Sequence, residues 1–362
     1  MSEVKESPVV GLLASYPLQP NLQAVLYNLG RMLKDEVTFH LVMGPEKLPE
    51  QLEGLVQSIH VDPPPVSTHG RGFSMKAAFS YASAHRPDVL MNVGQPYPLG
   101  IAVVTAGRVY GIRTVLRITG DYLAEASIAG TRREKIWRQL FHGTLLHNVY
   151  QQADTVLPVG RRLAQKLVGA GFPEETVHPL PQPFDAELFE QKAGAQKVEK
   201  KRELGLEPDR KMILNVGRLT WGKGADRVLE VARRVTDRAN GQFQFCLVGD
   251  GPYKEAFSSF PSEAVYTAGY VDREKVHEYF QAADLLIHPS RRDALPNVIL
   301  EAIAARVPVI ASPVGEIPDY VSTTLEGVPK YVDCILSKEW RCEPIPSWFS
   351  WEEQKSKYAR LL

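Results

Sequence analysis

Short apolar runs alternate with helical patterns along almost the whole chain of 362 residues. The runs are rich in Val, Ile and Leu and are apolar on both faces, which is typical of parallel strands buried within a sheet. This alternation of strand and helix predicts an α/β fold with doubly wound sheets. We expect strands at 8–15, 37–43, 88–94, 113–118, 155–159, 177–180, 211–217, 243–249, 264–268, 284–288 and 308–312, with helices at 21–34, 72–85, 98–110, 132–152, 160–170, 223–238, 272–282 and 296–305.

The pattern breaks between about 182 and 205, where the sequence is polar, charged and flanked by proline. We interpret this stretch as a linker with a short helix. Two halves of similar layout predict two Rossmann-like domains facing across a cleft, where ligands bind at the carboxyl ends of the strands. We place the domains at 1–186 and 187–347. A final helix is expected over 348–362, and the segment 321–347 reads as irregular.

The composition excludes several classes of protein. Lys and Arg number 42 and Asp and Glu also number 42, so no global basic field favours nucleic acid. Three cysteines without a C-x-x-C pair argue against a disulfide framework or a structural zinc site. The N-terminus lacks the apolar core of a signal peptide, and no apolar stretch is long enough to span a membrane. We therefore expect a cytoplasmic protein, with peripheral contact at the inner face of the membrane left open. The sequence does not specify an oligomeric state.

The first candidate site follows the apolar run at 211–217. Its loop carries two cations, Arg218 and Lys223, among Gly217, Gly222 and Gly224. Glycines let the backbone approach a phosphate closely, and the cations neutralise its charge. The loop is not a Walker A motif, because the G-K-[ST] ending is absent. The alternative is an exposed loop with two solvated charges.

The second candidate segment starts at Asp293 and leads into a helix that begins near Pro296. The amides of Asn297 and Val298 at the start of that helix would face an anion. Glu301 lies within a helix that is apolar all round, so it should be buried and in need of partners, which the hydroxyls of a ribose would supply. The alternatives are a Glu301 paired with an arginine and an Asp293 that caps the turn.

Weaker candidates lie at other strand ends and complete the set. The tight turn at Gly249, Asp250 and Gly251 closes one strand, and Tyr270 and Val271 follow the next; plain turn structure explains each of them as well. We add Ala294 and Leu295, which lie in the turn before Pro296. Cations, helix-start amides and placed carboxylates together predict a site for a nucleotide-diphosphate sugar.

Taken together, these segments resemble glycosyltransferase family 4, which has the GT-B architecture. The segment 268–321 is close to the C-terminal signature of that family, 148–189 resembles the last part of its N-terminal domain, and 349–362 resembles the helix that crosses back to the first domain. The resemblance implies an acceptor-side first domain and a nucleotide-sugar-binding second domain. It also implies retaining transfer without an essential metal or cofactor.

Carried over by motif, Arg218 and Lys223 would bind the diphosphate, Glu301 the ribose and Asp293 the donor sugar. Asp293 stands where the family usually has the first glutamate of its E-x7-E motif. The first half departs further from the family pattern. The loop 15–21 lacks the usual pair of glycines, and Thr119 stands where many members have a histidine. We predict Thr119, Gly120 and Asp121 as acceptor-side residues, with Asp121 also a catalytic candidate.

The sequence thus predicts a retaining hexosyltransferase that moves a hexose-type sugar from a UDP- or GDP-sugar to a glycan, lipid-linked or small-molecule acceptor. Helix 132–152 is basic at its start and carries bulky apolar residues, so it could meet an anionic lipid, although a surface helix with an apolar inner face explains it as well. Two alternatives are a nucleotide-sugar epimerase of the same architecture and a non-catalytic relative that binds a nucleotide sugar or glycan.

Overall fold

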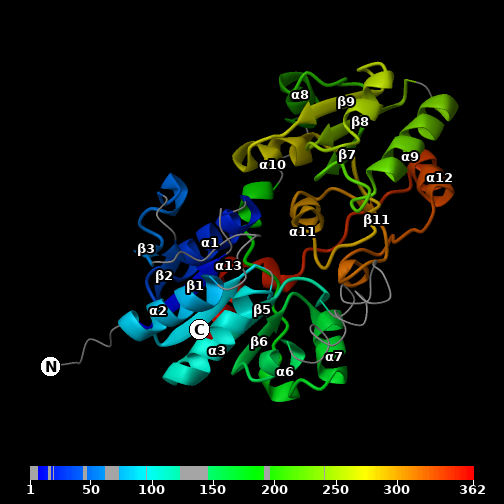
Figure 1. Ribbon diagram of the computed structural model, residues 1–362. Helices are drawn as coiled ribbons and strands as arrows, with labels where there is room; N and C mark the ends of the chain where they lie inside the picture. Colours follow the sequence, from blue (N-terminus) through cyan, green and yellow to red (C-terminus); the bar gives the residue numbers. More distant parts are fainter. Residues whose placement is uncertain are drawn as a thin grey trace. The chain divides into compact units, whose positions relative to one another are not determined.

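The computed structural model describes residues 7–14, 18, 20–43, 47–61, 73–94, 96–122, 146–190, 196–239 and 241–362. Contacts divide the chain into two units, each with its own parallel sheet (Figure 1). Unit 1 comprises Met1–Phe184 and Ser350–Leu362, and unit 2 comprises Asp185–Phe349.

The sheet of unit 1 has six parallel strands in the order β3-β2-β1-β4-β5-β6. Successive residues of β1 face opposite sides, so Leu12 packs with one hydrophobic cluster and Leu13 with another. Both faces of the sheet are therefore buried. The strands are β1 (Val9–Ala14), β2 (Thr38–Met43), β3 (Gln57–His60), β4 (Val89–Val93), β5 (Arg113–Ile118) and β6 (Thr155–Pro158).

Helices cover both faces of this sheet. Residues of α1 (Pro20–Leu33) and α13 (Trp351–Leu361) belong to the cluster on one face, and residues of α2 (Phe73–His85) and α3 (Leu99–Tyr110) to the cluster on the other. Two shorter helices, α6 (His147–Tyr150) and α7 (Arg161–Gly169), flank β6.

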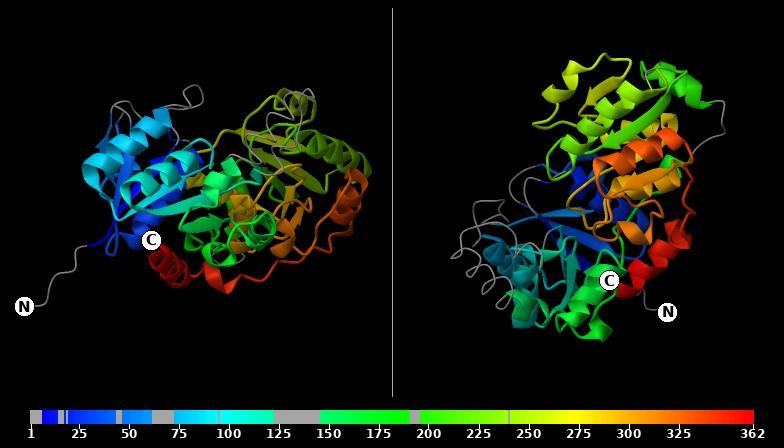
Figure 2. Two further views of the ribbon diagram at one scale, coloured as in Figure 1. Left: turned by 60° about the horizontal axis from the view of Figure 1, so that its bottom comes forward. Right: turned by 90° about the vertical axis from the view of Figure 1, so that its right-hand side faces the viewer.

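The final helix α13 is fastened to unit 1 by specific polar contacts. Its N-cap Ser350 accepts a hydrogen bond from the amide of Glu353. The side chain of Gln354 exchanges two hydrogen bonds with the backbone of Phe184, at 2.8 and 2.9 Å, and the Tyr358 hydroxyl donates to the Pro181 carbonyl at 2.7 Å. Figure 2 shows this helix, in red, beside the strands of unit 1.

The sheet of unit 2 has five parallel strands in the order β11-β10-β7-β8-β9. On one face, α9 and α12 pack over the sheet and contact each other; α8, α10 and α11 contact one another in the series α8-α10-α11. The strands are β7 (Lys211–Val216), β8 (Phe243–Val248), β9 (Val265–Gly269), β10 (Leu285–His288) and β11 (Val309–Ala311), and the helices are α8 (Gln196–Glu203), α9 (Ala225–Arg238), α10 (Arg273–Ala282), α11 (Asn297–Ala304) and α12 (Val328–Ser337).

The predicted class of fold, two Rossmann-like parallel sheets, is confirmed. The arrangement of the two units across a cleft stays a prediction.

Several predicted elements differ from the structure. The strand predicted at 177–180 is wrong, because only Val177 forms an isolated bridge, to Val156. The edge strand β3 was missed because it is short and half exposed. The segment 321–347 also contains a regular helix, α12, whose prolines obscured its apolar face of Tyr331, Val332 and Ile335. Most of the helix predicted at 132–152 lies outside the described residues.

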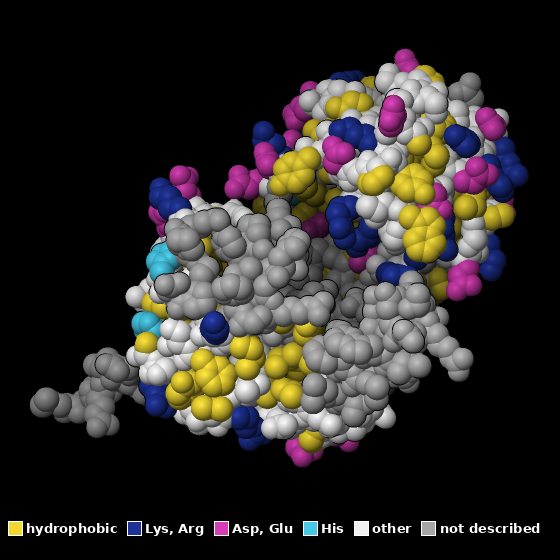
Figure 3. Space-filling model, viewed as in Figure 1, with side chains coloured by type: hydrophobic (Ala, Val, Ile, Leu, Met, Phe, Trp, Pro, Cys, Tyr) yellow, Lys and Arg dark blue, Asp and Glu magenta, His cyan; other side chains and the backbone are white. Residues whose placement is uncertain are grey.

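No helix among the described residues is long and apolar enough to cross a membrane. On the face of unit 2 seen in Figure 3, cationic, anionic and hydrophobic side chains are interspersed rather than gathered by type. This distribution agrees with the balanced charge of the sequence.

A buried ion pair joins α8 to the base of the unit 2 sheet. Lys201, whose side chain is 4% exposed, donates to Asp284 at 2.7 Å and to the Arg210 carbonyl at 2.8 Å. The same Asp284 oxygen accepts from the Met212 amide at 2.9 Å. Burial alone would raise the pKa of Asp284, but the hydrogen bonds from Lys201 and Met212 outweigh it and hold the pKa below its usual range.

We expect Asp284→Asn to lower the free energy of unfolding by about 3 kcal/mol, because it leaves the Lys201 ammonium buried without a counter-ion. The lowered pKa of Asp284 gives it a stabilising contribution above the unfolded pKa of about 3.9, and this contribution is lost as pH falls through the folded pKa. Urea denaturation at pH 7 and at about pH 2 tests both statements. The exposed Asp237→Asn is the control, and an equal loss in both variants would contradict the assignment.

Candidate functional site

The predicted loops of unit 2 meet at the carboxyl edge of its sheet, where parallel strands place ligand sites. The loops after β7 and β8 are in contact because glycines allow it. A Cβ atom at Gly249, where φ is +140°, would lie 2.0 Å from the Gly217 carbonyl oxygen, and one at Gly251 would lie 2.5 Å from that of Leu219. The Leu219 amide donates to the Asp250 carbonyl at 2.8 Å. The two loops therefore form one continuous surface.

A second set of contacts clamps the loop after β7 to the loop after β10. The carbonyl of Gly222 accepts from the Arg291 amide at 2.9 Å and from the Ser290 hydroxyl at 3.2 Å. The Arg291 guanidinium forms two parallel hydrogen bonds with Asp226, at 2.6 and 2.7 Å, and lies 4.2 Å from the centre of the Trp221 ring. Bidentate pairs of this kind fix geometry as well as charge.

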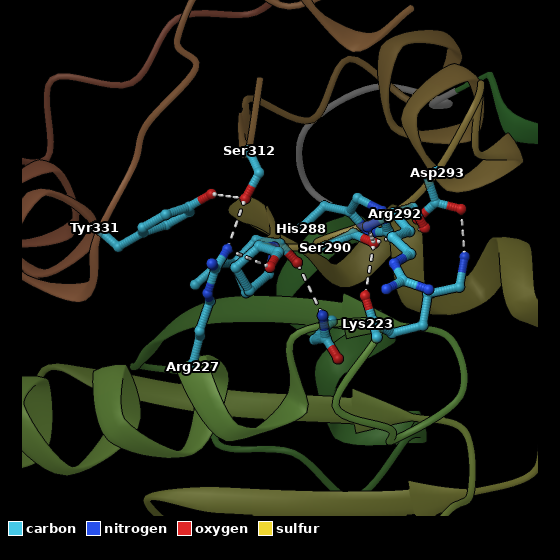
Figure 4. A network of polar contacts seen from close by, with 12 residues as sticks. Lys223, Arg227, His288, Ser290, Arg292, Asp293, Ser312 and Tyr331 are labelled. Carbon is cyan, nitrogen blue, oxygen red and sulfur yellow. Dashed lines mark hydrogen bonds and ion pairs between the residues drawn. The ribbon is translucent and has the colours of Figure 1, made fainter. Parts of the chain in front are cut away.

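The clamp brings Lys223 against Asp293, and these two predicted residues form an ion pair (Figure 4). The other oxygen of Asp293 accepts from Nε2 of His288 at 2.9 Å. The His288 side chain is only 3% exposed, and its buried Nδ1 has no hydrogen-bond partner among the described residues. Because the ionised carboxylate can only accept, His288 carries its proton on Nε2.

The electrostatics of Asp293 follow from these two partners. Its side chain is 12% exposed, and burial alone would raise its pKa. The hydrogen bond from His288, together with the charge and hydrogen bond of Lys223, outweighs burial and holds the pKa well below the usual range. Asp293 is therefore ionised at neutral pH and offers only acceptors to a ligand.

The turn from Asp293 into α11 is supported from behind by the loop after β11. The Glu316 amide donates to the Ala294 carbonyl at 2.7 Å. At Gly315, where φ is +56°, a Cβ atom would lie 2.2 Å from the carbonyl oxygens of both Asp293 and Ala294. The next residue, Leu295, is buried. Only glycine at position 315 allows this close approach.

Helix α11 begins after Pro296, which as the N-cap residue offers no side-chain hydrogen bond. Asn297 and Val298 lie in its first turn and are half-buried. Glu301 is 5% exposed, as the apolar pattern of its helix predicts. Such a burial requires polar partners for the carboxylate.

The remaining candidates of unit 2 are more exposed. Arg218 is exposed directly after β7, Tyr270 is 66% exposed after β9, and Val271 is half-buried beside it. The Asp250 carboxylate accepts from Lys254 and from the Gly251 amide, each at 2.7 Å. These two hydrogen bonds lower the pKa of Asp250, with Lys254 the larger cause.

The three candidates of unit 1 lie together after β5. Thr119, Gly120 and Asp121 are half-buried, and the Gly120 carbonyl accepts from the Tyr122 amide at 3.0 Å. Asp121 forms an ion pair of 2.7 Å with Lys166 of α7. This pair neutralises the carboxylate that we predicted for acceptor-side work.

Three residues of the site were not singled out from the sequence: His288, Arg291 and Gly315. His288 and Arg291 stand five and two residues before Asp293, yet nothing in their spacing shows which residues they contact. Gly315 precedes Glu316 in the loop after β11, and nothing in the sequence separates it from an ordinary loop glycine. Within the described ranges, no three His, Cys, Asp or Glu side chains gather as metal ligands.

Comparison with known proteins gives three related findings. Residues 196–329 match the model of a family described as glycosyl transferases group 1. A sulfoquinovosyl transferase of Arabidopsis thaliana is 28% identical over 189 residues, which cover 51% of this chain and 35% of that protein. A putative teichuronic acid biosynthesis glycosyltransferase of Bacillus subtilis is 37% identical over 119 residues, which cover 33% of this chain and 29% of that protein. The chain thus spans about a third of the length of these relatives.

Among solved structures, HepE of Anabaena in complex with UDP-glucose is similar over nearly the whole chain. The TM-score is 0.68 at 16% identity, and the match covers 98% of this chain and 95% of that chain. At this level of identity, the similarity shows a common fold.

The packing of the loop after β7 against the loop after β10 predicts that alanine at two nearby glycine positions lowers the free energy of unfolding by different amounts. We expect Gly224→Ala to lower the free energy of unfolding by about 2 kcal/mol or more, because φ is +77° and the Cβ would lie 2.2 Å from the Pro289 carbonyl oxygen. Gly222→Ala is the matched control, since its Cβ would meet nothing within 4 Å. Chemical denaturation measures both, and equal stability of the two variants would show that the loops are not packed as described.

Proposed function

We propose, from the match of residues 196–329 to the glycosyl transferases group 1 model, that the chain is a glycosyltransferase using a nucleotide-diphosphate sugar. The donor is a UDP- or GDP-sugar, a hexose-type sugar is moved, and the acceptor is a glycan, a lipid-linked sugar or a small molecule. The observation that carries the proposal is the pairing of Lys223 with Asp293 at the carboxyl edge of the unit 2 sheet. That pair sets a cation for phosphate beside a carboxylate for sugar hydroxyls.

The diphosphate is bound by the loop after β7 and the start of α11. Arg218 and Lys223 supply positive charge, and the first turn at Asn297 and Val298 adds the positive end of the helix dipole. These groups stabilise the charge that develops on the departing diphosphate as fixed electrostatics. This role needs no metal ion or cofactor.

Asp293 contacts the donor sugar. Each oxygen of its carboxylate has two acceptor positions, and the structure fills one on each oxygen, with Lys223 and with His288. Sugar hydroxyls take the remaining positions. A glutamate at this place would reach about one methylene further, so aspartate draws the sugar closer to the strand end.

Glu301 binds the ribose from the interior of α11. The loops at Gly249–Gly251 and Tyr270–Val271 line the rest of the nucleotide site. Ala294 and Leu295 belong to the turn that carries Asp293. The structure of HepE with UDP-glucose supports a nucleotide-sugar ligand for this fold. Transfer proceeds with retention, on the same face of the sugar, and the leaving phosphate takes the acceptor proton.

Unit 1 serves the acceptor. Thr119, Gly120 and Asp121 lie at the carboxyl end of β5 and present a hydroxyl, backbone groups and a carboxylate. Asp121 must leave or share Lys166 to act on a hydroxyl of the acceptor. We place the protein in the cytoplasm, with peripheral contact at the inner face of the membrane if the acceptor is lipid-linked.

We expect a donor nucleotide sugar at 100 times its dissociation constant to stabilise the wild-type chain by about 2.7 kcal/mol, and Lys223→Ala to abolish this effect. A thermal-shift panel of UDP- and GDP-sugars measures it. Lys330→Ala, on the exposed face of α12, is the control and should retain the full shift. A full donor-induced thermal shift in the Lys223→Ala variant would show that Lys223 does not bind the donor.

Asp293→Asn should preserve the donor-induced thermal shift but slow donor cleavage about 100-fold, because the amide has one acceptor oxygen and no negative charge. Release of UDP or GDP without acceptor gives the rate, with the exposed Asp237→Asn as control. A non-catalytic binding protein would show the thermal shift without any nucleotide release in the wild type. Unchanged release in Asp293→Asn would show that this carboxylate does not contact the sugar.

A further inference from the structure

Unit 2 contains a cavity of about 430 Å³ that lies outside the proposed donor site. Its lining includes Arg227 of α9, Ser290 after β10, Ser312 after β11, and Glu326 and Gly327 before α12. Arg291, which positions the loops of the donor site, also lines this cavity, but none of the lining residues is assigned to contact the nucleotide sugar. In Figure 4, Arg227, Ser312 and Tyr331 lie on one side of Ser290, and Lys223 and Asp293 lie on the other.

Arg227 brings an uncompensated positive charge to this cavity. Its Nη1 contacts only neutral acceptors, the Pro289 carbonyl at 3.2 Å and the Ser312 hydroxyl at 3.4 Å. Both distances exceed the 2.7–2.9 Å that is usual for a charged donor and a carboxylate. Among the described residues, no carboxylate forms a salt bridge with Arg227, whereas the neighbouring Arg291 is fully engaged by Asp226.

The Ser312 hydroxyl in the cavity lining contacts a second buried hydroxyl behind it, that of Tyr331. The side chains of Ser312 and Tyr331 are 3% and 0% exposed, and their oxygens lie 3.1 Å apart. Burial raises the pKa of Tyr331 to about 12, so its hydroxyl is neutral at pH 7. Polar groups of this kind, held in place in a cavity wall, orient a ligand rather than merely attract it.

The rim of the cavity carries a carboxylate, in contrast to the cationic Arg227. Glu326 is exposed and is found in no salt bridge within the described part of the chain. A carboxylate accepts hydrogen bonds and repels a second anion. A ligand that satisfies the whole cavity therefore needs an anionic group at Arg227 and hydroxyl donors at Glu326. The apolar walls of Pro313 and Val314 suit the carbon skeleton between them.

We propose that this cavity binds a phosphorylated sugar or polyol, with its phosphate at Arg227 and Ser312 and its hydroxyls at Glu326. The planar guanidinium of Arg227 has donors to spare for phosphate oxygens, which it binds two at a time. The site is separate from the donor site, and its existence does not depend on the proposed transferase activity.

Isothermal titration calorimetry of the full chain with sorbitol 6-phosphate, inorganic phosphate and sorbitol tests the proposal. We expect sorbitol 6-phosphate to bind at least ten times more tightly than either fragment. Arg227→Met should weaken it at least tenfold, and the exposed Glu326→Gln should reduce its preference over inorganic phosphate. Arg233→Met, also on α9 and exposed, should bind like the wild type.

The Lys223→Ala variant separates this site from the donor site, because it should bind sorbitol 6-phosphate with unchanged affinity. Loss of binding in Lys223→Ala with retention in Arg227→Met would place the ligand in the donor site and overturn the proposal. Equal affinity for inorganic phosphate and sorbitol 6-phosphate would show that the cavity binds the phosphate alone, which contradicts the proposed recognition of the hydroxyl groups. Circular dichroism checks that Arg227→Met is folded. Glu326→Gln tests the same cavity at an exposed position, where a substitution is not expected to disturb folding.

Discussion

The backbone carbonyl of Gly222 is the contact on which the candidate site depends. It accepts hydrogen bonds from the Arg291 amide and the Ser290 hydroxyl, and so joins the loop after β7 to the loop after β10. Without this junction, Lys223 and Asp293 would belong to two independent loops 70 residues apart in sequence. Glycine at position 224 then lets the chain turn past Pro289 into α9. A short piece of backbone geometry thus sets the distance between two opposite charges.

Two largely buried aspartates of unit 2 have similar partners but lie at different ends of the sheet. Asp284 and Asp293 both have a lowered pKa despite burial, because each faces a lysine and a further donor. At Asp284 the partners include the Lys201 ammonium and the backbone of Met212, so the cluster is closed. At Asp293 the lysine is 28% exposed and the cluster lies at a strand end, where a ligand can enter it. Position on the sheet therefore separates a structural ion pair from a candidate binding one.

The sequence predicted the elements of the site better than their contacts. Strand and helix periodicity placed Arg218, Lys223, Asp293 and Glu301 on the correct elements. Residues 196–329 match the glycosyl transferases group 1 model, and the narrower family 4 assignment stays a prediction. Pairing between Lys223 and Asp293 could not be predicted, because it depends on tertiary contacts such as that of Arg291 with Asp226. Edge strand β3 and helix α12 were missed because polar residues and prolines weakened their periodic patterns.

The order of the two units along the chain has a consequence for biosynthesis. Tyr358 of α13 is part of the hydrophobic core of unit 1, yet it is translated after the whole of Asp185–Phe349. Unit 2 is a continuous segment and can complete its core while the ribosome is still adding residues. Unit 1 keeps α1 on that face of its sheet, but the part that α13 covers stays open until α13 has been synthesised. Unit 1 therefore completes its core after unit 2, although most of its residues are synthesised earlier.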